Sequence, residues 1–185
     1  MLFSFMIFKA RLEQPDSSEY NEYYGRYVAL VPNGDIVQTL SDQLKTTLDF
    51  IPTLGLEADQ PYTPGKWSLK QMLGHLVDTE RVFSYRALSF ARGDTAALPG
   101  MEQDDFQIHS EANSRSLESL FMEYTFLRQA NVLMFEALPE VAWMRFGTAS
   151  GSRVSVRALA HMIAGHELHH LNILSTQSEK CVSIF

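Results

Sequence analysis

Cysteine is almost absent from this chain, because Cys181 is the only one among 185 residues. A single cysteine excludes an internal disulfide framework and is typical of proteins in a reducing compartment. Basic residues are also in the minority: 15 Lys and Arg stand against 22 Asp and Glu, which gives a formal net charge of −7. An acidic chain without a basic cluster argues against a nucleic-acid surface. We therefore expect a cytoplasmic protein that does not bind nucleic acid.

Long apolar runs are missing as well. No stretch approaches the ~18 apolar residues of a membrane-spanning helix, so we expect no membrane association. The opening MLFSFMIFKA is apolar, but no positive charge precedes it and no convincing cleavage site follows. We expect this run either to lie on the body of the protein or to precede a start at Met6, rather than to direct export.

Composition and periodicity indicate the fold class. A chain of 185 residues with 45% hydrophobic and 20% charged residues is typical of one globular domain, expected over 1–185 with a core at about 16–175. Strand alternation is hard to find. Helical periodicity, with caps and stop signals, predicts four long helices at about 35–52, 68–93, 116–138 and 155–177. The expected fold is all-α, a four-helix bundle with a short extra N-terminal helix.

Two segments outside these helices have functional interest. Tyr20, Tyr23, Tyr24 and Tyr27 fall at helical spacing, which predicts a short aromatic helix packed across the bundle, with a substrate-lining role as the alternative. The connection at 93–113 is long for a bundle, and long ordered loops often serve a site.

The stretch AGHELHHLNIL matches the H-E-x-x-H pattern of zinc peptidases at His166, Glu167 and His170. Two histidines four residues apart lie on one side of a helix and can hold one metal ion together. A catalytic zinc also needs a third protein ligand, usually downstream in peptidases. The downstream positions of the longer peptidase pattern hold Ile173 and Thr176. A peptidase is therefore not expected, and a third ligand must lie upstream.

His75 is the upstream candidate, in the middle of the helix expected at 68–93. A lone buried histidine is usually a hydrogen-bonded core residue. When the inward-facing pair His166 and His170 is considered as well, metal ligation becomes the favoured interpretation of His75, because one divalent ion satisfies three buried imidazoles at once. We therefore predict His75, His166 and His170 as the metal ligands.

Four further residues are not predicted to be metal ligands: His109, His161, Glu167 and His169. His169 competes as a ligand, but its angle around the helix predicts a flanking position. Glu167 is expected at the rim of the site or behind the ligands, because the rest of a peptidase site is missing. His109 and His161 do not share the apolar stripe and are expected to be solvated.

Asp78 follows His75 by about one helical turn. It could accept the second N–H of the His75 ring and fix its tautomer, as metal-bound histidines usually require. The alternative is an exposed acid near Arg81 or Arg86, and the sequence does not decide between the two.

Three segments resemble a known family: KWSLKQMLGHLVDTERVFSYRALSFARGD, LPGMEQDDF and GTASG…VSVRALAHMIAGHELHH. In order and spacing they look like the DinB/YfiT-like metalloenzyme superfamily, in its DinB_2 branch, over roughly 16–175. The resemblance implies a four-helix bundle, commonly dimeric, with a divalent metal on three histidines. By motif these correspond to His75 in GHLVDTE and to His166 and His170 in GHELHH. The ends MLFSF and SEKCVSIF depart from the family pattern.

The resemblance also implies a function. Relatives include metal-dependent transferases of thiols such as bacillithiol or mycothiol, and an isomerase that uses mycothiol. Three neutral histidines leave a divalent ion able to acidify a bound thiol or water. We expect a divalent metal (Zn, Ni, Fe or Mn), a low-molecular-weight thiol, a small-molecule substrate, a homodimer and a role in stress response.

Transfer of the thiol to an electrophile is the first hypothesis. The alternatives are a metal-hydroxide hydrolase and a non-catalytic, metal-stabilised dimeric binding protein. The sequence by itself names no catalytic residue.

Overall fold

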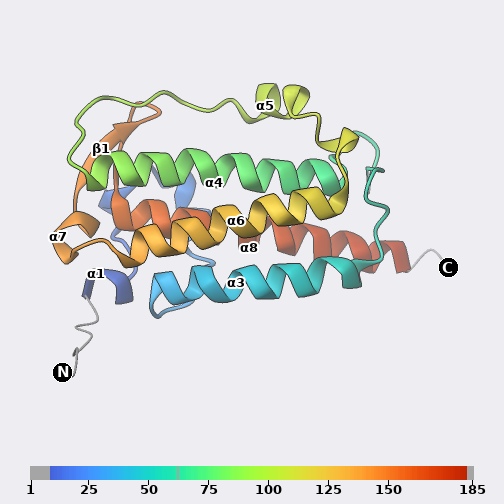
Figure 1. The fold of residues 1–185 in the computed structure, drawn as a ribbon, viewed down its shortest axis with the longest axis horizontal. Coiled ribbons are helices and arrows are strands. Elements are labelled where there is room, and N and C mark those ends of the chain that lie inside the picture. The colour runs from blue at the N-terminus through green and yellow to red at the C-terminus, as the bar shows by residue number, and fades with distance from the viewer. Residues whose placement is uncertain (1–8, 62, 183–185) are drawn as a thin grey trace.

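The computed structural model describes residues 9–61 and 63–182, with side chains through residue 178. Four long helices form a bundle (Figure 1): α3 (Ile36–Phe50), α4 (Leu69–Ala91), α6 (Leu117–Glu136) and α8 (Val156–Val182). The all-α four-helix bundle is thereby confirmed. The expectations for the opening run fall on residues 1–8, outside the described part of the chain, as does the side chain of Cys181.

Local signals set the starts of α3, α4 and α8 and the end of α4 where the sequence predicts them, whereas α8 continues to Val182, past the expected end at about residue 177. Ser68 and Gln71 form a reciprocal capping box at the start of α4. Gly93, with φ of 86°, follows the end of that helix in a conformation that favours glycine. Asp35 caps α3, and Ser155 Oγ accepts a hydrogen bond from Ala158 N at 3.0 Å in the first turn of α8.

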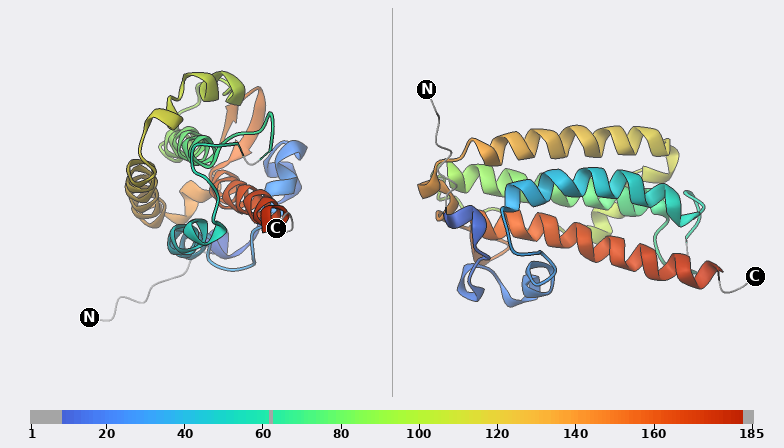
Figure 2. Two further views of the ribbon diagram at one scale, coloured as in Figure 1. Left: turned by 90° about the vertical axis from the view of Figure 1, so that its right-hand side faces the viewer. Right: turned by 90° about the horizontal axis from the view of Figure 1, so that it is seen from below.

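The chain direction explains the long connection between the second and third long helices. In Figure 1, α4 and α6 run in the same direction, opposite to α3 and α8. Residues 92–116 return the chain along the bundle and contain α5 (Gln103–His109) and η4 (Ala112–Ser114). Figures 1 and 2 both place this segment on the outer side of α4. A parallel pair of helices requires such a return, whereas antiparallel neighbours need only a short turn.

A β-hairpin precedes α8, where the sequence indicated only a connection. Strand β1 (Phe146–Ala149) pairs antiparallel with β2 (Ser152–Ser155). Ser150 and Gly151 form the two-residue turn, both with positive φ, as in hairpin turns that match the strand twist.

The hairpin tip holds the long connection in place. Leu98 N donates to Thr148 O at 2.9 Å, and Ser150 N donates to Leu98 O at 3.1 Å. The segment after Leu98 is therefore fixed beside α4 rather than free to move over the surface.

The N-terminal segment is less regular than the single short helix expected there. It comprises α1 (Lys9–Leu12), η1 (Ser17–Glu19), η2 (Glu22–Tyr24) and α2 (Gly25–Val28); the remaining short helices are η3 (Ile51–Leu54) and α7 (Glu140–Trp143). Buried Glu19 accepts hydrogen bonds from Arg157 Nε and from Ser155 Oγ, which fasten this segment to the start of α8.

Two apolar clusters fill the bundle. The larger includes Phe83, Phe90, Phe135, Trp143 and Ile163, and the smaller includes Leu73, Leu76, Leu120, Leu171 and Leu174. On α8, Ile163 belongs to the first and Leu171 to the second, and the stretch between them contains buried polar side chains. The functional candidates therefore lie in a polar layer inside the bundle. Within the described residues, every helix is too short or too polar to cross a membrane.

Candidate metal centre

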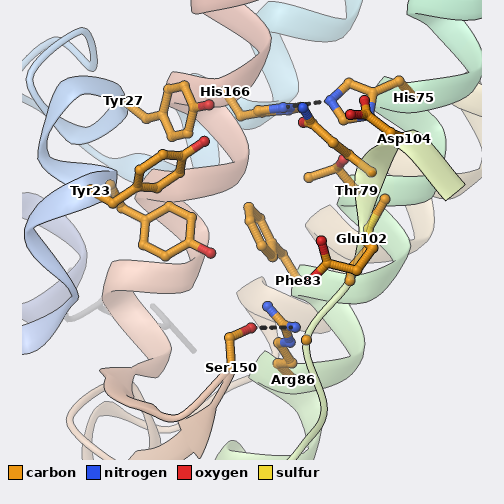
Figure 3. A pocket seen from close by; sticks show the side chains of 14 residues that line it. Tyr23, Tyr27, His75, Thr79, Phe83, Arg86, Glu102, Asp104, Ser150 and His166 are labelled. Atoms are coloured by element: carbon orange, nitrogen blue, oxygen red, sulfur yellow. Dashed lines mark hydrogen bonds between the residues drawn. The ribbon is translucent and has the colours of Figure 1, made fainter. Parts of the chain in front are cut away.

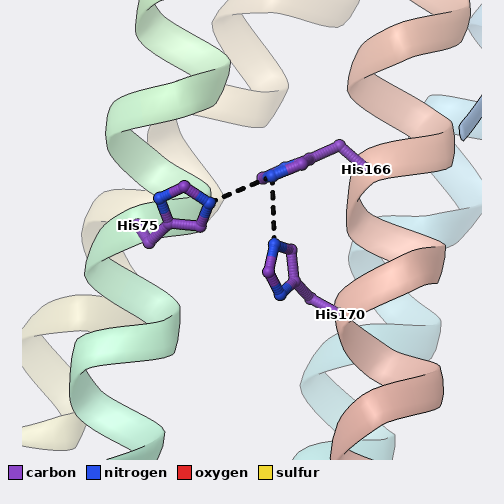
Figure 4. A group of neighbouring side chains, drawn as sticks. All are labelled: His75, His166 and His170. Atoms are coloured by element: carbon purple, nitrogen blue, oxygen red, sulfur yellow. Dashed lines mark hydrogen bonds between the residues drawn. The ribbon is translucent and has the colours of Figure 1, made fainter. Parts of the chain in front are cut away.

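His75 enters the bundle interior from α4, where only 4% of the residue is exposed. The ring of Trp67, just before the helix, lies against it with ring centroids 4.8 Å apart. Apolar contact on one side of the imidazole limits its rotation and leaves Nε2 facing α8 (Figure 4).

His166 and His170 lie one turn apart on α8, with 6% and 8% of each residue exposed. The preceding residue, Gly165, allows α2 to approach closely, since a Cβ there would lie 2.0 Å from Tyr27 O. The Tyr27 ring consequently packs edge-on against His166, with centroids 5.3 Å apart.

The three predicted ligands converge through their Nε2 atoms. His75 Nε2 and His170 Nε2 each lie 3.0 Å from His166 Nε2, as Figure 4 shows. One ring nitrogen from each of the three residues lies within 4.8 Å of the others. The structure thus brings together, from two helices, the residues that the sequence singled out.

Hydrogen bonds among the three rings cannot satisfy all three Nε2 atoms. The Nε2 of a neutral imidazole is either one donor or one acceptor, yet His166 Nε2 faces two ring nitrogens. A tetrahedral zinc ion with Zn–N bonds of about 2.05 Å separates its ligand nitrogens by about 3.3 Å, close to the observed spacing. Three convergent imidazole donors therefore fit a divalent ion.

Burial keeps the three imidazoles neutral. It lowers the pKa of His75 to about 4 and that of His170 to about 3. It also holds the pKa of His166 well below the ordinary value, with further lowering by the two neighbouring imidazoles. Near neutral pH all three rings carry a lone pair that a cation can accept.

The cluster opens on one side into a pocket of about 420 Å³ (Figure 3). His75 and His166 stand at one end, and Arg86 with Ser150 at the other. Further lining comes from the N-terminal tyrosines, from α4 and from the long connection: Tyr23, Tyr24, Tyr27, Thr79, Phe83, Gly100, Met101, Glu102, Gln103 and Asp104. Three of the four tyrosines therefore line the pocket, which was the alternative expectation, and the long connection forms part of its wall.

His169 lies beside the cluster rather than in it. Its ring centroid is 5.2 Å from those of Tyr27 and His170, and the residue is partly exposed. Asp78 is half-buried, and burial raises its pKa while the nearby Arg81 lowers it. It is not among the residues lining the pocket. The acid near Arg81 is thus the description that fits Asp78.

Of the two places expected for Glu167, the rim of the site is excluded. The residue is 1% exposed and faces Thr47, Tyr124 and Arg128 on α3 and α6, not a rim. Arg128 Nη2 donates to Glu167 Oε2 at 2.8 Å, and Thr47 and Tyr124 hydroxyls donate to Oε1. The carboxylate belongs to a buried network that also contains Glu80, and it is not available as a base in the pocket.

The expectation for His161 was wrong. The residue was expected to be solvated, but it is 2% exposed, and its Nδ1 lies 2.9 Å from Arg157 O, as a donor to that carbonyl. Burial lowers its pKa to about 4. His109, in contrast, is exposed on α5 as expected.

Pocket residues missed by the sequence reasoning include Thr79, Phe83 and Arg86 on α4 and Asp104 on α5. Spacing gave a usable signal for the first three, because they follow His75 at intervals of four, four and three residues on one helix face. For Asp104 the only signal was its place in the long connection.

Comparisons with known proteins agree with this description. No curated protein matches the chain. A solved structure of YfiT from Bacillus subtilis, described as a probable metal-dependent hydrolase with an unusual four-helix bundle topology, superposes with a TM-score of 0.67 at 14% identity. The match covers 91% of this chain and 93% of YfiT, and at that identity it establishes the fold. The DinB_2 family model, DinB superfamily, matches residues 35–174. This span includes α3, α4, α6 and most of α8, and the chain belongs to the DinB superfamily.

Proposed function

We propose that this protein is a divalent-metal-dependent enzyme that transfers a low-molecular-weight thiol to an electrophilic small molecule. The observation that carries the proposal is the convergence of three neutral imidazole nitrogens at one end of an open pocket. His75, His166 and His170 would hold the ion. When bound, a divalent ion on three neutral ligands lowers the pKa of a thiol or of water beside it.

The surrounding residues suit a thiol better than a reaction that needs a strong base. Glu167 is engaged with Arg128, and Asp78 lies outside the pocket lining. Asp104 is exposed at the pocket, where its charge acts on His75, and it can pass the thiol proton to solvent. The thiol sulfur then bonds to an electrophilic carbon, whose leaving group departs with the bonding electrons.

Hydrolysis of a small ester or amide is the second candidate. Two observations favour it: Asp104 can accept a proton from an attacking water, and YfiT is described as a probable metal-dependent hydrolase. The two candidates share the ion and the pocket and differ in the nucleophile.

Parallel assays distinguish these functions. Tag-free protein, loaded separately with Zn, Ni, Fe or Mn, is assayed for conjugation of chlorodinitrobenzene with a panel of low-molecular-weight thiols, and for cleavage of 4-nitrophenyl esters without thiol. Thiol transfer predicts metal-dependent conjugation that is lost in His75→Ala. Thiol-independent ester cleavage supports the hydrolase instead.

Inactivity in both assays, with a lower melting temperature after metal removal, would support a non-catalytic, metal-stabilised protein. The expected homodimer stays a prediction, to be measured by analytical ultracentrifugation of the same samples.

A further inference from the structure

Arg86 places a buried cation in the wall of the pocket, with 4% of the residue exposed. Its Nη2 donates to Pro99 O at 2.7 Å and to Ser150 Oγ at 3.1 Å, and both acceptors are neutral. The other deeply buried arginines have carboxylate partners: Arg128 pairs with two glutamates and Arg157 with Glu19. Buried charges are almost always paired, so an arginine without an acid is an exception that needs an explanation.

The acids that line the same pocket do not supply the missing partner. Glu102 and Asp104 are exposed, and neither forms a salt bridge with Arg86 among the described contacts. Burial lowers the pKa of Arg86, which means that the protein environment disfavours its charge, and the nearby Tyr24 is the polar group that offsets this. A bound anion would offset it more fully.

The geometry of α4 directs Arg86 toward the histidine end. Eleven residues separate it from His75 on the same helix face, which is about 16 Å along the axis at 1.5 Å per residue. Helical side chains lean toward the N-terminus, here toward His75. Figure 3 shows both residues in one pocket, with Phe83 between them. The guanidinium carbon lies 5.7 Å from the centre of that ring, so an apolar ring lines the pocket next to Arg86 on the side toward His75.

We propose that Arg86 binds the carboxylate of an elongated anionic substrate whose reacting end lies at the histidine cluster. Nη2 is occupied by Pro99 and Ser150, whereas no hydrogen bond is described for Nε or Nη1, and each can donate one charge-assisted hydrogen bond to a carboxylate. The position of the reacting end rests on the proposed function, whereas recognition of the carboxylate by Arg86 does not require the metal. The substrate class is therefore a small carboxylic acid with an apolar spacer.

A series of thiols of increasing length tests the spacing. Tag-free protein is loaded with Co²⁺ and titrated with mercaptoalkanoic acids and with mercaptoalkanols of matching length, and the sulfur-to-cobalt absorption band reports binding. The acids are expected to bind about tenfold more tightly than the alcohols at the length that spans the pocket, as one charge-assisted contact allows. Arg86→Met should remove this preference and leave the affinity for the alcohols unchanged.

Arg81→Met is the matched control, because Arg81 lies on the same helix but is half-exposed and pairs with Glu123. It should keep the preference. Arg86→Gln removes the charge while it keeps an amide donor for Pro99 O, and it replaces Arg86→Met if that variant does not fold. Equal affinity of acids and alcohols in the wild type, or a preference that survives loss of Arg86, would overturn the proposal.

A second titration separates the two proposals. Calorimetry of metal-free protein with hexanoate and hexanol should show tighter binding of hexanoate, lost in Arg86→Met and kept in Arg81→Met. If the protein takes up no metal but shows this preference, the metal-dependent function is wrong and the role of Arg86 stands. If metal and thiols bind but neither titration shows a carboxylate preference, the role of Arg86 is wrong and the metal site stands.

Discussion

Arg128 lies between two buried carboxylates, and its Nη2 is 2.8 Å from both Glu80 Oε2 and Glu167 Oε2. Removal of the cation leaves both acids without their charge partner in the interior. We therefore expect Arg128→Met to lower the free energy of unfolding by about 3–5 kcal/mol. Urea unfolding of the metal-free protein measures this. Arg81→Met, which breaks a half-exposed pair with Glu123, should cost less than about 1 kcal/mol, and equal losses in the two variants would contradict the importance of the buried network.

The histidine cluster predicts a selective loss of metal. His75→Ala and His170→Ala should each reduce the metal content of tag-free protein from near one ion per chain to near zero, because two imidazoles hold a divalent ion weakly. His169→Ala should keep the ion, since that ring lies beside the cluster. Elemental analysis by mass spectrometry gives the content. Full occupancy in His170→Ala would refute the assignment of the ligands.

His161 predicts a pH dependence of stability. Its pKa is about 4 in the folded protein and near 6.5 when unfolded, so the unfolded state binds more protons between these values. The stabilisation is complete above pH 6.5 and falls as the pH drops toward 4, by on the order of 3 kcal/mol in total. His161→Asn can still donate to Arg157 O but does not titrate in this range, and its stability should vary less with pH. Parallel curves for the two proteins would show that His161 does not contribute.

Two glycines in the middle of long helices should respond differently to alanine. Gly165→Ala places a Cβ 2.0 Å from the backbone oxygen of Tyr27, so α2 must move. We expect a loss of about 1–3 kcal/mol or more in unfolding free energy, as for other overpacked sites. In Gly74→Ala the nearest atom is Ala112 Cβ at 3.2 Å, and better helix propensity, worth about 1 kcal/mol, offsets the tight contact. Thermal melts of both variants test the contrast, which similar losses would contradict.

The parts of this fold that depend on neighbours in sequence could be predicted. Apolar periodicity, the capping box at Ser68 and the stop at Gly93 are local signals, and they placed all four long helices. The hairpin at 146–155 was missed because its strands are four residues long, with too few positions for alternation to show. The parallel direction of α4 and α6 was also not predicted, although the length of residues 92–116 is its consequence.

The candidate site also divides into features that sequence neighbours determine and features that depend on other helices. A pair four apart with a histidine on another helix could be recognised from spacing, whereas His161 was wrongly assigned to solvent and one of the two alternatives for Glu167 was an exposed rim. Both assignments assumed that α8 has a solvent-facing side, but residues 154–167 are buried without interruption. A helical projection gives the direction of a side chain, and only the surrounding elements determine what it meets there. The partner of Glu167, Arg128, lies on α6, and the sequence of α8 contains no signal that predicts this contact.

His166 and Glu167 are adjacent but point toward different partners, His75 on α4 and Arg128 on α6, and this also fixes how α8 can change during evolution. Successive residues on a helix differ by about 100°, so insertion or deletion of one residue between Arg157 and His166 would turn the histidine pair away from His75. The same change would turn Glu167 away from Arg128, while the start of the helix stays attached to Glu19. The length of this stretch in residues is therefore fixed, in addition to the limits that its burial sets on substitutions. Residues 93–97 of the long connection have no such constraint, because they precede the anchor at Leu98 and do not line the pocket, and changes in chain length are expected there.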